Sequence, residues 1–531
     1  MKTWQDVASL YQIYPRSFRD TNGDGIGDLN GITEKLDYLA WLGVDAIWIS
    51  PFFTSPLTDF GYDIADYREI DPIFGGLDDF RALLERAHIL DIKVMIDLVP
   101  CHTSDQHPWF QEARSSRDNP KRDYYVWRDG RGGNEPNNWR SLSGGSSWEL
   151  DEQTGQFYLH SFLKTQPDLN WDNPAVRDEM KNVVRFWFDM GVDGMRVDAI
   201  WGISKDPEMR DDSPNPDFHG DPEAYGAFIH DHCKMGPHFQ EYLRELASVC
   251  DEYDDKQMVF EFYPDEKLGD IYQQYHKVLT AHPKASAFFM EYRQDEWHAE
   301  HTGQKIEKYL QAAGSAKPFF CVGNHDQPRI ASRLGTERAR ALHFLNLLTP
   351  GVSVMYYGDE IGMTNGELTT EDIQDNFSSA NSIIDSRDLE RTPMQWDDTR
   401  FAGFSEVKPW LPVNKNRSFV NVNSEKSSPM SILNLHRALL RLRQEFPIIK
   451  NGTLNIVSGA DTGNGFILGI KRELGRERAY IFINFADAPQ SFSIPENGRI
   501  LASTHPQYLL LGKDRQMTIP GYCGVILIVG N

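Results

Sequence analysis

The chain lacks long hydrophobic runs. None of its stretches approaches the roughly 20 apolar residues that are needed to cross a bilayer. Its first residues, Met1-Lys2-Thr3-Trp4-Gln5-Asp6, contain no uninterrupted apolar segment of the kind found in signal peptides. These absences predict a cytoplasmic protein with no membrane partner.

Cysteine is also scarce. The chain of 531 residues has five cysteines, which are widely scattered and form no Cys-x-x-Cys pair. An odd number of distant cysteines fits reduced thiols better than a disulfide framework. The sequence also contains no internal repeat and no low-complexity tract.

Positive charge is in deficit. Lysine and arginine total 54 against 78 aspartate and glutamate residues, which gives a formal net charge of −24. Such a surface repels phosphate groups, so nucleic acids and anionic membranes are not expected as partners. The acidic excess is otherwise explained by solubility alone.

Aromatic residues, in contrast, are abundant, with 13 Trp, 21 Tyr and 30 Phe. Sugar-binding clefts use aromatic rings because the apolar face of a pyranose packs against them. Most of these residues must nevertheless lie in the core. The composition therefore permits a carbohydrate ligand without establishing one.

The dominant pattern is a short apolar strand followed by an amphipathic helix. The expected strands are apolar on both faces, as parallel strands covered by helices should be. They are residues Leu10–Tyr14, Asp45–Ser50, Lys93–Val99, Gly194–Ala199, Met258–Tyr263, Ala287–Tyr292, Phe319–Gly323 and Val352–Tyr357. The expected helices include Ile32–Leu42, Phe80–Leu90, Val176–Met190, Phe239–Cys250, Thr336–Leu348 and Ile432–Phe446. Eight such strands predict an α/β fold, a (β/α)₈ barrel.

Two segments break this alternation. Residues 101–171 are rich in Gly, Asn, Trp and Arg, with short strands such as Gln156–Phe162, and a loop of that length is usually functional or a small domain. After residue 451 the period becomes two, with expected strands Phe466–Lys471, Ala479–Phe485 and Val525–Val529. We therefore expect a barrel over 1–100 and 172–450, an inserted subdomain over 101–171, and a C-terminal β-sandwich-like domain over 451–531.

Polar side chains follow the expected strands at the barrel mouth, where catalytic residues of such barrels lie. They are Asp63, Asp97, His102, Arg196, Asp198, Glu261 and the run Asn324-His325-Asp326. Each residue alone is more simply explained as a helix cap or an ion-pair partner, and Asp97 is interpreted as structural. Together, converging carboxylates would raise some of one another's pKa values, so that one carboxyl stays protonated while another stays ionised.

These residues fall in segments that resemble the α-amylase family of glycoside hydrolases. The matching segments are Asp97-Leu98-Val99-Pro100-Cys101-His102, Gly194-Met195-Arg196-Val197-Asp198, Val259-Phe260-Glu261 and Val322-Gly323-Asn324-His325-Asp326. The segments Gln166-Pro167-Asp168-Leu169-Asn170-Trp171 and Arg391-Thr392-Pro393-Met394-Gln395-Trp396-Asp397 are similar to the oligo-1,6-glucosidase and α-glucosidase subgroup. The resemblance extends from Tyr11 to about Phe446.

The resemblance implies a role for each residue. Asp198 would be the nucleophile, Glu261 the general acid and base, and Asp326 the group that stabilises the transition state. Arg196 would keep Asp198 ionised. The remaining substrate contacts would come from His102, His325, Tyr62, and a clamp of Asp63 with Arg387 or Arg391. The substrate would be a small oligosaccharide or glucoside, cleaved with retention from its non-reducing end, by a monomer or homodimer.

Two positions depart from the family pattern. Cys101 stands where Asn is usual, so that one polar contact must be missing or supplied elsewhere. Phe260 stands where Gly usually precedes the acid, and a bulky neighbour could reorient Glu261 or raise its pKa by desolvation. Glu291 is a distant second candidate for the acid.

An acidic loop near the start of the chain resembles the first nine positions of an EF-hand loop. Ligand oxygens would come from Asp20, Asn22, Asp24, Asp28 and the carbonyl of Ile26. The twelfth position is Gly31 rather than Glu, and the segment alone could be an ordinary turn. Because members of the subgroup carry a similar loop, the resemblance implies a structural Ca²⁺ or Mg²⁺ ion and no catalytic cofactor.

Ala199, which follows the expected nucleophile, bears on linkage specificity. In the subgroup this position tends to be Val in α-1,6-selective enzymes, so that Ala199 favours α-1,4 substrates such as maltose. The difference is worth only about 1–3 kcal/mol. Transglucosylation, a sucrose- or trehalose-type isomerase or transferase, and a non-catalytic relative that acts as a binding subunit remain the alternatives.

Overall fold

A closed barrel of eight parallel strands forms the centre of the molecule. The computed structural model describes residues 2–293, 297–377, 386–457, 463–508, 510–511 and 515–529. The barrel strands are β1 (Ser9–Ile13), β2 (Ala46–Ile49), β5 (Lys93–Leu98), β9 (Gly194–Val197), β10 (Gln257–Phe260), β11 (Ala285–Phe289), β12 (Phe319–Cys321) and β13 (Val352–Tyr356). They pair in the order β1-β13-β12-β11-β10-β9-β5-β2. The predicted (β/α)₈ barrel is confirmed.

The barrel strands are fully buried because helices cover them on the outside and side chains fill the inside. Trp48 and Phe288 stack in the interior, 5.4 Å apart, among other apolar residues from β2, β5, β10 and β12. The interior is therefore a packed core rather than a channel. Several expected strands extend one to three residues beyond the observed ends, and β9 and β10 end directly before Asp198 and Glu261.

Twelve α-helices are present in the described residues. They are α1 (Leu29–Leu42), α2 (Leu77–Ile89), α3 (Pro108–Ser115), α4 (Pro174–Met190), α5 (Phe239–Ala247), α6 (Ile271–Leu279), α7 (Ala299–Ala313), α8 (Ile330–Leu334), α9 (Thr336–Leu348), α10 (Val422–Ser427), α11 (Ile432–Glu445) and α12 (Pro447–Asn451). The boundaries follow local capping signals. Asn173 caps α4 ahead of Pro174, and Gly191 ends that helix with a positive φ of 115°.

The segment between β5 and α4 forms its own small sheet. Its strands are β6 (Trp127–Arg128), β7 (Trp148–Asp151) and β8 (Gln156–Leu159), in the antiparallel order β6-β8-β7. The aromatic residues of this segment pack against each other, as in the parallel stack of Phe110 on Trp127. The predicted strand Gln156–Phe162 is confirmed as β8 but ends at Leu159.

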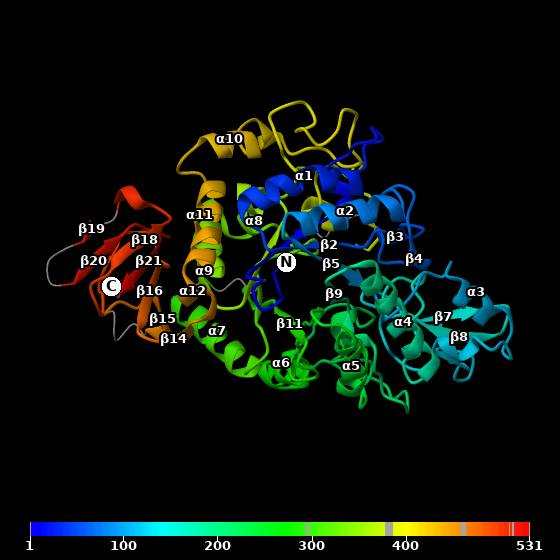
Figure 1. The fold of residues 1–531 in the computed structure, drawn as a ribbon. Coiled ribbons are helices and arrows are strands. Elements are labelled where there is room, and N and C mark those ends of the chain that lie inside the picture. Colours follow the sequence, from blue (N-terminus) through cyan, green and yellow to red (C-terminus); the bar gives the residue numbers. More distant parts are fainter. Residues whose placement is uncertain are drawn as a thin grey trace.

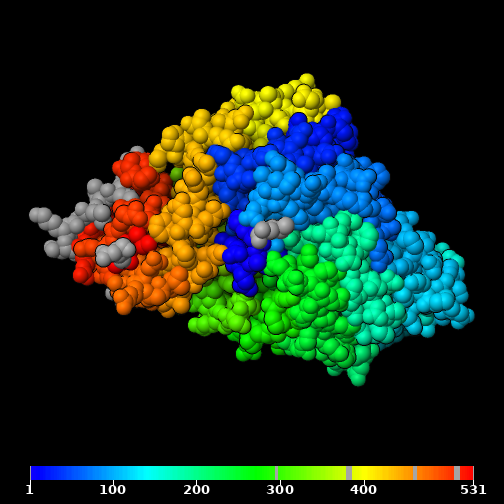
Figure 2. All heavy atoms as spheres, viewed as in Figure 1, coloured from blue at the N-terminus to red at the C-terminus, as the bar shows by residue number. Residues whose placement is uncertain are grey.

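The C-terminal strands form two antiparallel sheets. One sheet has the order β14 (Thr453–Val457), β15 (Ile467–Leu474), β16 (Glu477–Asn484), β21 (Gly524–Val529) and β18 (Arg499–Ser503), and the other has β17 (Gln490–Ser493), β20 (Gln516–Ile519) and β19 (Leu510–Leu511). The five-stranded sheet lies against α7, α9 and α12. In Figures 1 and 2 both sheets occupy the end of the molecule opposite the inserted segment.

A two-stranded ribbon, β3 (Phe53–Thr54) with β4 (Asp66–Ile70), precedes α2 and lies near the inserted segment in Figure 1. In the described part of the chain, no helix has both the length and the apolar character to cross a membrane.

Candidate active site

A pocket opens at the carboxyl ends of the barrel strands. Its volume is about 520 Å³. The polar residues that line it include Asp59, Tyr62, His102, Asp198, Glu261, Asp326, Gln327 and Arg387. All three predicted catalytic carboxylates therefore face one cavity, although each follows a different strand. This convergence is what the barrel topology imposes on residues at strand ends.

Arg196 lies beneath the pocket and holds three carboxylates. Its guanidinium is fully buried, with Nη1 2.6 Å from Asp198 Oδ1 and Nη2 2.6 Å from Glu261 Oε1. Nη1 also contacts Asp97, which accepts a hydrogen bond of 2.6 Å from the Trp48 indole. Arg196 is therefore a positioning residue behind the pocket wall and does not line it. The interpretation of Asp97 as structural agrees with its place here.

One guanidinium cannot neutralise three carboxylates, and the pKa values of two of these carboxyl groups are raised. Burial raises the pKa of Asp97 to about 7, against the opposing charge of Arg196. Burial likewise raises the pKa of Asp198. The positive charge of Arg196 opposes this rise, and the neighbouring Glu261 carboxyl adds to it. The cluster thus takes up a proton at a higher pH than isolated carboxylates do.

Glu261 is held in place despite the bulk of Phe260. The backbone N–H of Ala199 donates to Glu261 Oε2 at 3.2 Å, and Arg196 holds the other oxygen. Successive residues of a strand point to opposite faces. Accordingly, Phe260 packs in the core cluster between strands and helices, while Val259 packs inside the barrel. Phe260 therefore does not line the pocket, and the expected disturbance of Glu261 has no structural basis.

Glu291, the second candidate for the acid, is placed elsewhere. It accepts a hydrogen bond of 3.3 Å from the Tyr275 hydroxyl and is not among the residues that line the pocket. Its burial without access to the pocket leaves Glu261 as the carboxyl that can reach a glycosidic oxygen.

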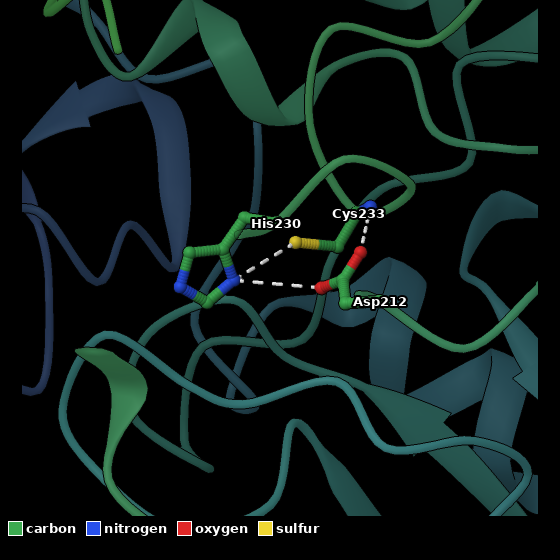
Figure 3. A group of neighbouring side chains, drawn as sticks. All are labelled: Asp212, His230 and Cys233. Atoms are coloured by element: carbon green, nitrogen blue, oxygen red, sulfur yellow. Dashed lines mark hydrogen bonds and ion pairs between the residues drawn. The ribbon is translucent and has the colours of Figure 1, made fainter. Parts of the chain in front are cut away.

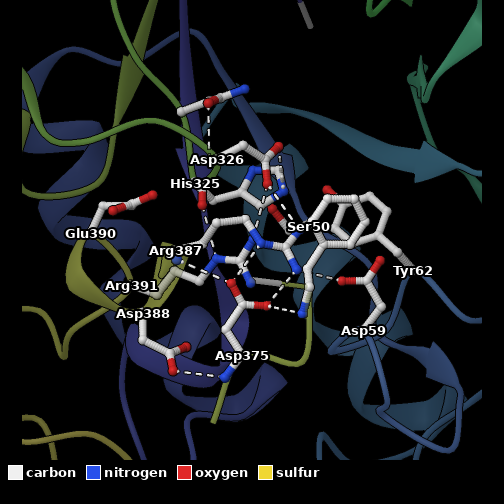
Figure 4. A network of polar contacts seen from close by, with 12 residues as sticks. Ser50, Asp59, Tyr62, His325, Asp326, Asp375, Arg387, Asp388, Glu390 and Arg391 are labelled. Atoms are coloured by element: carbon white, nitrogen blue, oxygen red, sulfur yellow. Dashed lines mark hydrogen bonds and ion pairs between the residues drawn. The ribbon is translucent and has the colours of Figure 1, made fainter. Parts of the chain in front are cut away.

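The Asp326 carboxylate lies close to the side chains of Arg387 and Arg391 (Figure 4). Arg391 Nη2 donates to Asp326 Oδ1 at 2.9 Å, and Arg387 Nη1 lies 3.5 Å from the same oxygen. Burial alone would raise the pKa of Asp326, but His325, Arg391 and Arg387 together lower it. Asp326 therefore stays ionised while the Arg196 cluster holds a proton.

Arg391 was predicted to contact substrate, but it is buried behind the residues that line the pocket. It is 1% exposed, and its Nε donates to the carbonyl oxygen of His325 at 2.9 Å. Arg391 therefore positions both His325 and Asp326 and does not line the pocket.

Arg387 does line the pocket, and two acidic residues that the sequence analysis missed hold it. Its Nη2 lies 2.7 Å from Asp59 Oδ1, and Asp375 accepts from both Nε and Nη2 at 3.0 and 2.7 Å. Figure 4 shows both carboxylates pointing toward the guanidinium. Bidentate pairing of this kind fixes the orientation of the arginine as well as its position.

The predicted partnership of Asp63 with one of these arginines is wrong. The Asp63 carboxylate is fully buried and accepts from the Ser55 hydroxyl and from the backbone N–H groups of Thr58 and Asp59. No hydrogen bond or ion pair joins Asp63 to Arg387 or Arg391 in the described contacts. Asp63 instead holds the loop that carries Asp59 into the pocket.

The two predicted histidines present nitrogen atoms close to the pocket. Gln12 bonds to Nδ1 of His325 at 2.7 Å, which leaves its buried Nε2 without a hydrogen-bond partner, 3.3 Å from Asp326 Oδ2. His102 lines the pocket, and its Nδ1 also has no partner. Tyr62 lines the pocket and stacks in parallel on His325, with ring centroids 5.3 Å apart. Buried unsatisfied nitrogens are costly unless a ligand completes them.

Aromatic residues that the sequence analysis did not assign also line the pocket. These residues are Phe162, Trp201, Tyr225, Tyr263 and Phe377. They come from the inserted segment and from loops after strands, so that sequence spacing gave no signal for them.

A buried lysine lies close to Cys101. Cys101 is fully buried, and a Cβ atom on Gly202 would lie 2.5 Å from its sulfur. The Lys205 ammonium lies 2.9 Å from Asp168 and also bonds to the carbonyl of Gly202. Lys205 therefore joins the inserted segment to the barrel next to Cys101.

The acidic loop is closed by its own hydrogen bonds. Asp20 accepts from the backbone N–H groups of Gly23 and Gly25 at 2.7 and 2.9 Å. Asp28 accepts from Thr21 and caps α1 through Gly31. Asn22 and Asp24 each accept one backbone N–H within the loop, the donor to Asp24 being Ile26. Each carboxylate oxygen has two lone pairs, so these bonds leave acceptor capacity for a hard cation.

Comparisons with known proteins agree with this geometry. The family described as "Alpha amylase, catalytic domain" matches residues 12–452. The oligo-1,6-glucosidase of Parageobacillus thermoglucosidasius is 39% identical over 534 residues, covering 93% of each chain.

Solved structures are similar over the full length. The α-glucosyl transfer enzyme XgtA superposes with a TM-score of 0.91 at 35% identity, covering 100% of both chains. The trehalulose synthase MutB of Pseudomonas mesoacidophila superposes with a TM-score of 0.87 at 36% identity, covering 99% of both chains. With its three carboxylates gathered at the mouth of a (β/α)₈ barrel, the chain belongs to the α-amylase family of glycoside hydrolases.

Proposed function

We propose that the protein is a retaining α-glucosidase that removes glucose from the non-reducing end of short oligosaccharides. The observation that carries this proposal is that Arg196 pairs with both Asp198 and Glu261, each 2.6 Å from a different nitrogen of one guanidinium. Because one guanidinium holds both carboxyl groups, it favours the separation of about 5–5.5 Å that retaining enzymes need over the wider separation of inverting enzymes.

The reaction would proceed in two displacements. Asp198 attacks the anomeric carbon while Glu261 protonates the departing glycosidic oxygen, which yields a glucosyl ester on Asp198. Glu261 then removes a proton from water, which attacks the anomeric carbon, breaks its bond to Asp198 and releases glucose with its original anomeric configuration. The charge of Arg196 opposes the rise in the pKa of Asp198 that burial causes, and so favours the ionised nucleophile.

Asp326 and the group formed by Arg387, Asp59 and Asp375 would contact the sugar bound beside Asp198. The low pKa of Asp326 keeps it negative near the ring as positive charge develops in the transition state. The pairing of Arg387 with Asp59 and Asp375 offers fixed donors and acceptors to the hydroxyl groups of one terminal glucose. A terminal unit held in this way supports exo-acting cleavage.

Two variants test the assignment of roles. Glu261→Gln should lose about 10²–10⁴-fold in kcat/KM on maltose, the range for general acid catalysis, but much less on α-glucosyl fluoride, whose leaving group needs no proton. This ratio reports formation of the glucosyl ester, so the loss of the base in the second step does not enter it. Asp198→Asn should lose activity on both substrates. Glu291→Gln is the matched control and should keep normal activity. Full maltose turnover by Asp198→Asn would overturn the mechanism, and equal losses on both substrates would remove Glu261 as the acid.

We propose that α-1,4 linkages are preferred over α-1,6 linkages. Support comes from Ala199, which lines the pocket beside Asp198 with only a methyl group. The relative named oligo-1,6-glucosidase argues in the other direction. The ratio of kcat/KM for maltose and isomaltose measures this preference directly, and a ratio below unity would contradict it.

Glucosyl transfer is the second candidate, and the aromatic residues that line the pocket favour it. Phe162, Trp201 and Phe377 offer faces on which an acceptor sugar could stack in place of water. The structural relatives include an α-glucosyl transfer enzyme and a trehalulose synthase. NMR of the products from maltose, isomaltose and sucrose separates the activities, since hydrolysis gives free monosaccharides and transfer or isomerisation gives new glucosides.

A structural divalent cation is proposed for the acidic loop. Ligands would be Asp20, Asn22, Asp24, Asp28 and the carbonyl of Ile26, all hard oxygen donors suited to Ca²⁺ or Mg²⁺. A chelator should lower the melting temperature of the wild type and leave Asp24→Ala unaffected. An unchanged melting temperature, with no calcium or magnesium found by elemental analysis, would contradict the proposal.

A reducing, cytoplasmic location is proposed as well. All five cysteines are buried and free, which supports a compartment in which thiols stay reduced. Thiol titration of the denatured protein from freshly lysed cells should count five free thiols per chain.

A further inference from the structure

A second cluster of reactive side chains lies beside the pocket, in the loop between β9 and α5. Asp212, His230 and Cys233 are 2%, 3% and 8% exposed, and one ligand atom from each lies within 4.8 Å of the others. Among the described residues, this is the one group of three or more acidic, histidine or cysteine side chains that meets this distance. Neither the family resemblance nor the proposed reaction uses these three residues.

The hydrogen bonding of His230 determines which of its nitrogens carries a lone pair. Nε2 lies 3.0 Å from the carbonyl oxygen of Tyr225, which can only accept, so Nε2 carries the proton. In the neutral ring, Nδ1 is then unprotonated. Figure 3 shows two contacts leaving this one nitrogen, to Cys233 Sγ at 3.5 Å and to Asp212 Oδ2 at 3.4 Å.

Asp212 Oδ2 is buried and makes no hydrogen bond, although the other oxygen of this carboxylate is well satisfied. Oδ1 accepts from the backbone N–H groups of His232 and Cys233 at 2.8 and 3.1 Å. A carboxylate lone pair facing an imidazole lone pair is repulsive in a buried site. A metal ion between the two atoms would remove this repulsion, as would a proton shared among the three side chains.

The distances agree with a metal ion. Zinc bonds of about 2.3 Å to sulfur, 2.0–2.1 Å to nitrogen and 2.0–2.2 Å to oxygen place tetrahedral ligands about 3.6 Å apart for S and N, and about 3.3–3.5 Å for N and O. The observed separations are 3.5 Å for Cys233 Sγ to His230 Nδ1 and 3.4 Å for His230 Nδ1 to Asp212 Oδ2.

We propose that Asp212 Oδ2, His230 Nδ1 and Cys233 Sγ form a Zn²⁺ site, with water as the fourth ligand. The Nε2–H bond of His230 to a carbonyl is the outer contact that orients metal-binding histidines. Binding would convert the Cys233 thiol to a thiolate and release its proton to solvent.

The ion would stabilise one wall of the substrate pocket. Tyr225 and Lys234 line that pocket and flank the zinc ligands in sequence. Tyr225 stacks on the His230 ring, with centroids 3.8 Å apart. Asp212 is also tied to the inserted segment, since its N–H donates to the side chain of Asn138 at 2.7 Å. One ion would thus join the loop, the pocket wall and the inserted segment.

Cobalt is the probe that tests the site, because Co²⁺ bound to a thiolate gives a near-ultraviolet charge-transfer band that oxygen ligands alone do not give. Reduced, metal-free wild-type protein titrated with Co²⁺ should develop this band up to one ion per chain, and Zn²⁺ should abolish it. Cys233→Ser should not develop it. Cys250→Ser, which removes another buried cysteine, and Asp24→Ala, which alters the acidic loop, should both retain it.

The wild-type titration decides the proposal even if a variant fails to fold. Absence of the band from wild-type protein whose thiols are shown to be reduced would overturn it, and would indicate a protonated His230 paired with Asp212. A band that persists in Cys233→Ser would also overturn it. Because the readout does not depend on turnover, failure of the glucosidase proposal would leave this result unchanged.

Discussion

Asp59→Asn tests most directly how the pocket recognises the terminal sugar. Asp59 lines the pocket, is 5% exposed, and lies 2.7 Å from Arg387 Nη2. Its other oxygen accepts from Gln166 at 2.9 Å. The amide keeps the size and one carbonyl oxygen of the carboxylate but removes its charge. Because Asp375 still holds Arg387 through two bonds, the arginine should keep its place in this variant.

The expected loss follows from the hydrogen bonds that a charged carboxylate makes. A hydrogen bond to a charged group contributes about 1.5–3 kcal/mol, which corresponds to roughly a 10- to 150-fold fall in kcat/KM. The retained pair with Asp375 keeps the effect on folding below the 3–5 kcal/mol or so that follows when a buried pair loses a partner completely. The variant should therefore fold normally and bind glucosides poorly.

Monodeoxy p-nitrophenyl α-glucosides identify the hydroxyl group that Asp59 recognises. In the wild type, removal of that hydroxyl should lower kcat/KM about as much as Asp59→Asn does, and in the variant its removal should have little further effect. Asp375→Asn is the control, because Asp375 lies behind Arg387 and does not line the pocket. Its effect should be the same for every deoxy substrate. Additive losses for all hydroxyls in Asp59→Asn would refute the assignment.

Three further predictions concern residues around the cluster. Phe260→Ala should lower the free energy of unfolding by about 3–5 kcal/mol in urea titration while leaving the pH dependence of kcat unchanged, because Phe260 packs in the core; a shifted pH profile would contradict this. Ala199→Val should lower the maltose-to-isomaltose ratio of kcat/KM by about 10-fold or more, and Ala199→Gly, which suits the φ of 42° there, should not. Burial raises the pKa of Asp97 to about 7, so the native state keeps a proton that the unfolded chain releases. The free energy of unfolding should therefore fall as the pH rises from about 4 to 7, and this fall should be smaller in Asp97→Asn, in which buried carboxyls such as Asp63 still contribute.

The barrel could be predicted because its signal is repeated and local. Each strand is a short apolar run, and each helix carries its own start and stop signals, as at Asp28 and Gly43 of α1. The strand ends were less certain. The predicted strand Gly194–Ala199 stops at Val197, because Ala199 turns into the left-handed region with φ of 42°. That turn directs the N–H of Ala199 at Glu261, a consequence that no propensity encodes.

The catalytic carboxylates were predictable for the same reason as the strands. Asp198 and Glu261 directly follow β9 and β10, so that the register of the barrel alone places them at the mouth. The pairing of Arg387 with Asp59 and Asp375 was not predictable in this way. Asp59 and Asp375 lie in long loops, 328 and 12 residues from Arg387, and only the folded course of those loops brings them together. The zinc cluster is similar, since its ligands share one irregular loop.

The error over Asp63 shows how a buried carboxylate's role follows from its donors. Asp63 has three donors, two of them backbone N–H groups of the neighbouring loop, and burial still raises its pKa to about 6. A carboxylate satisfied by the backbone cannot turn to a ligand without undoing the loop. Asp59, four residues earlier, accepts from the side chains of Arg387 and Gln166 and lines the pocket, so that it can also accept from a sugar hydroxyl. The position of Asp63 next to Tyr62 in the sequence indicated the correct loop. Only the hydrogen-bond donors distinguish Asp63, which holds the loop, from Asp59, which faces the substrate.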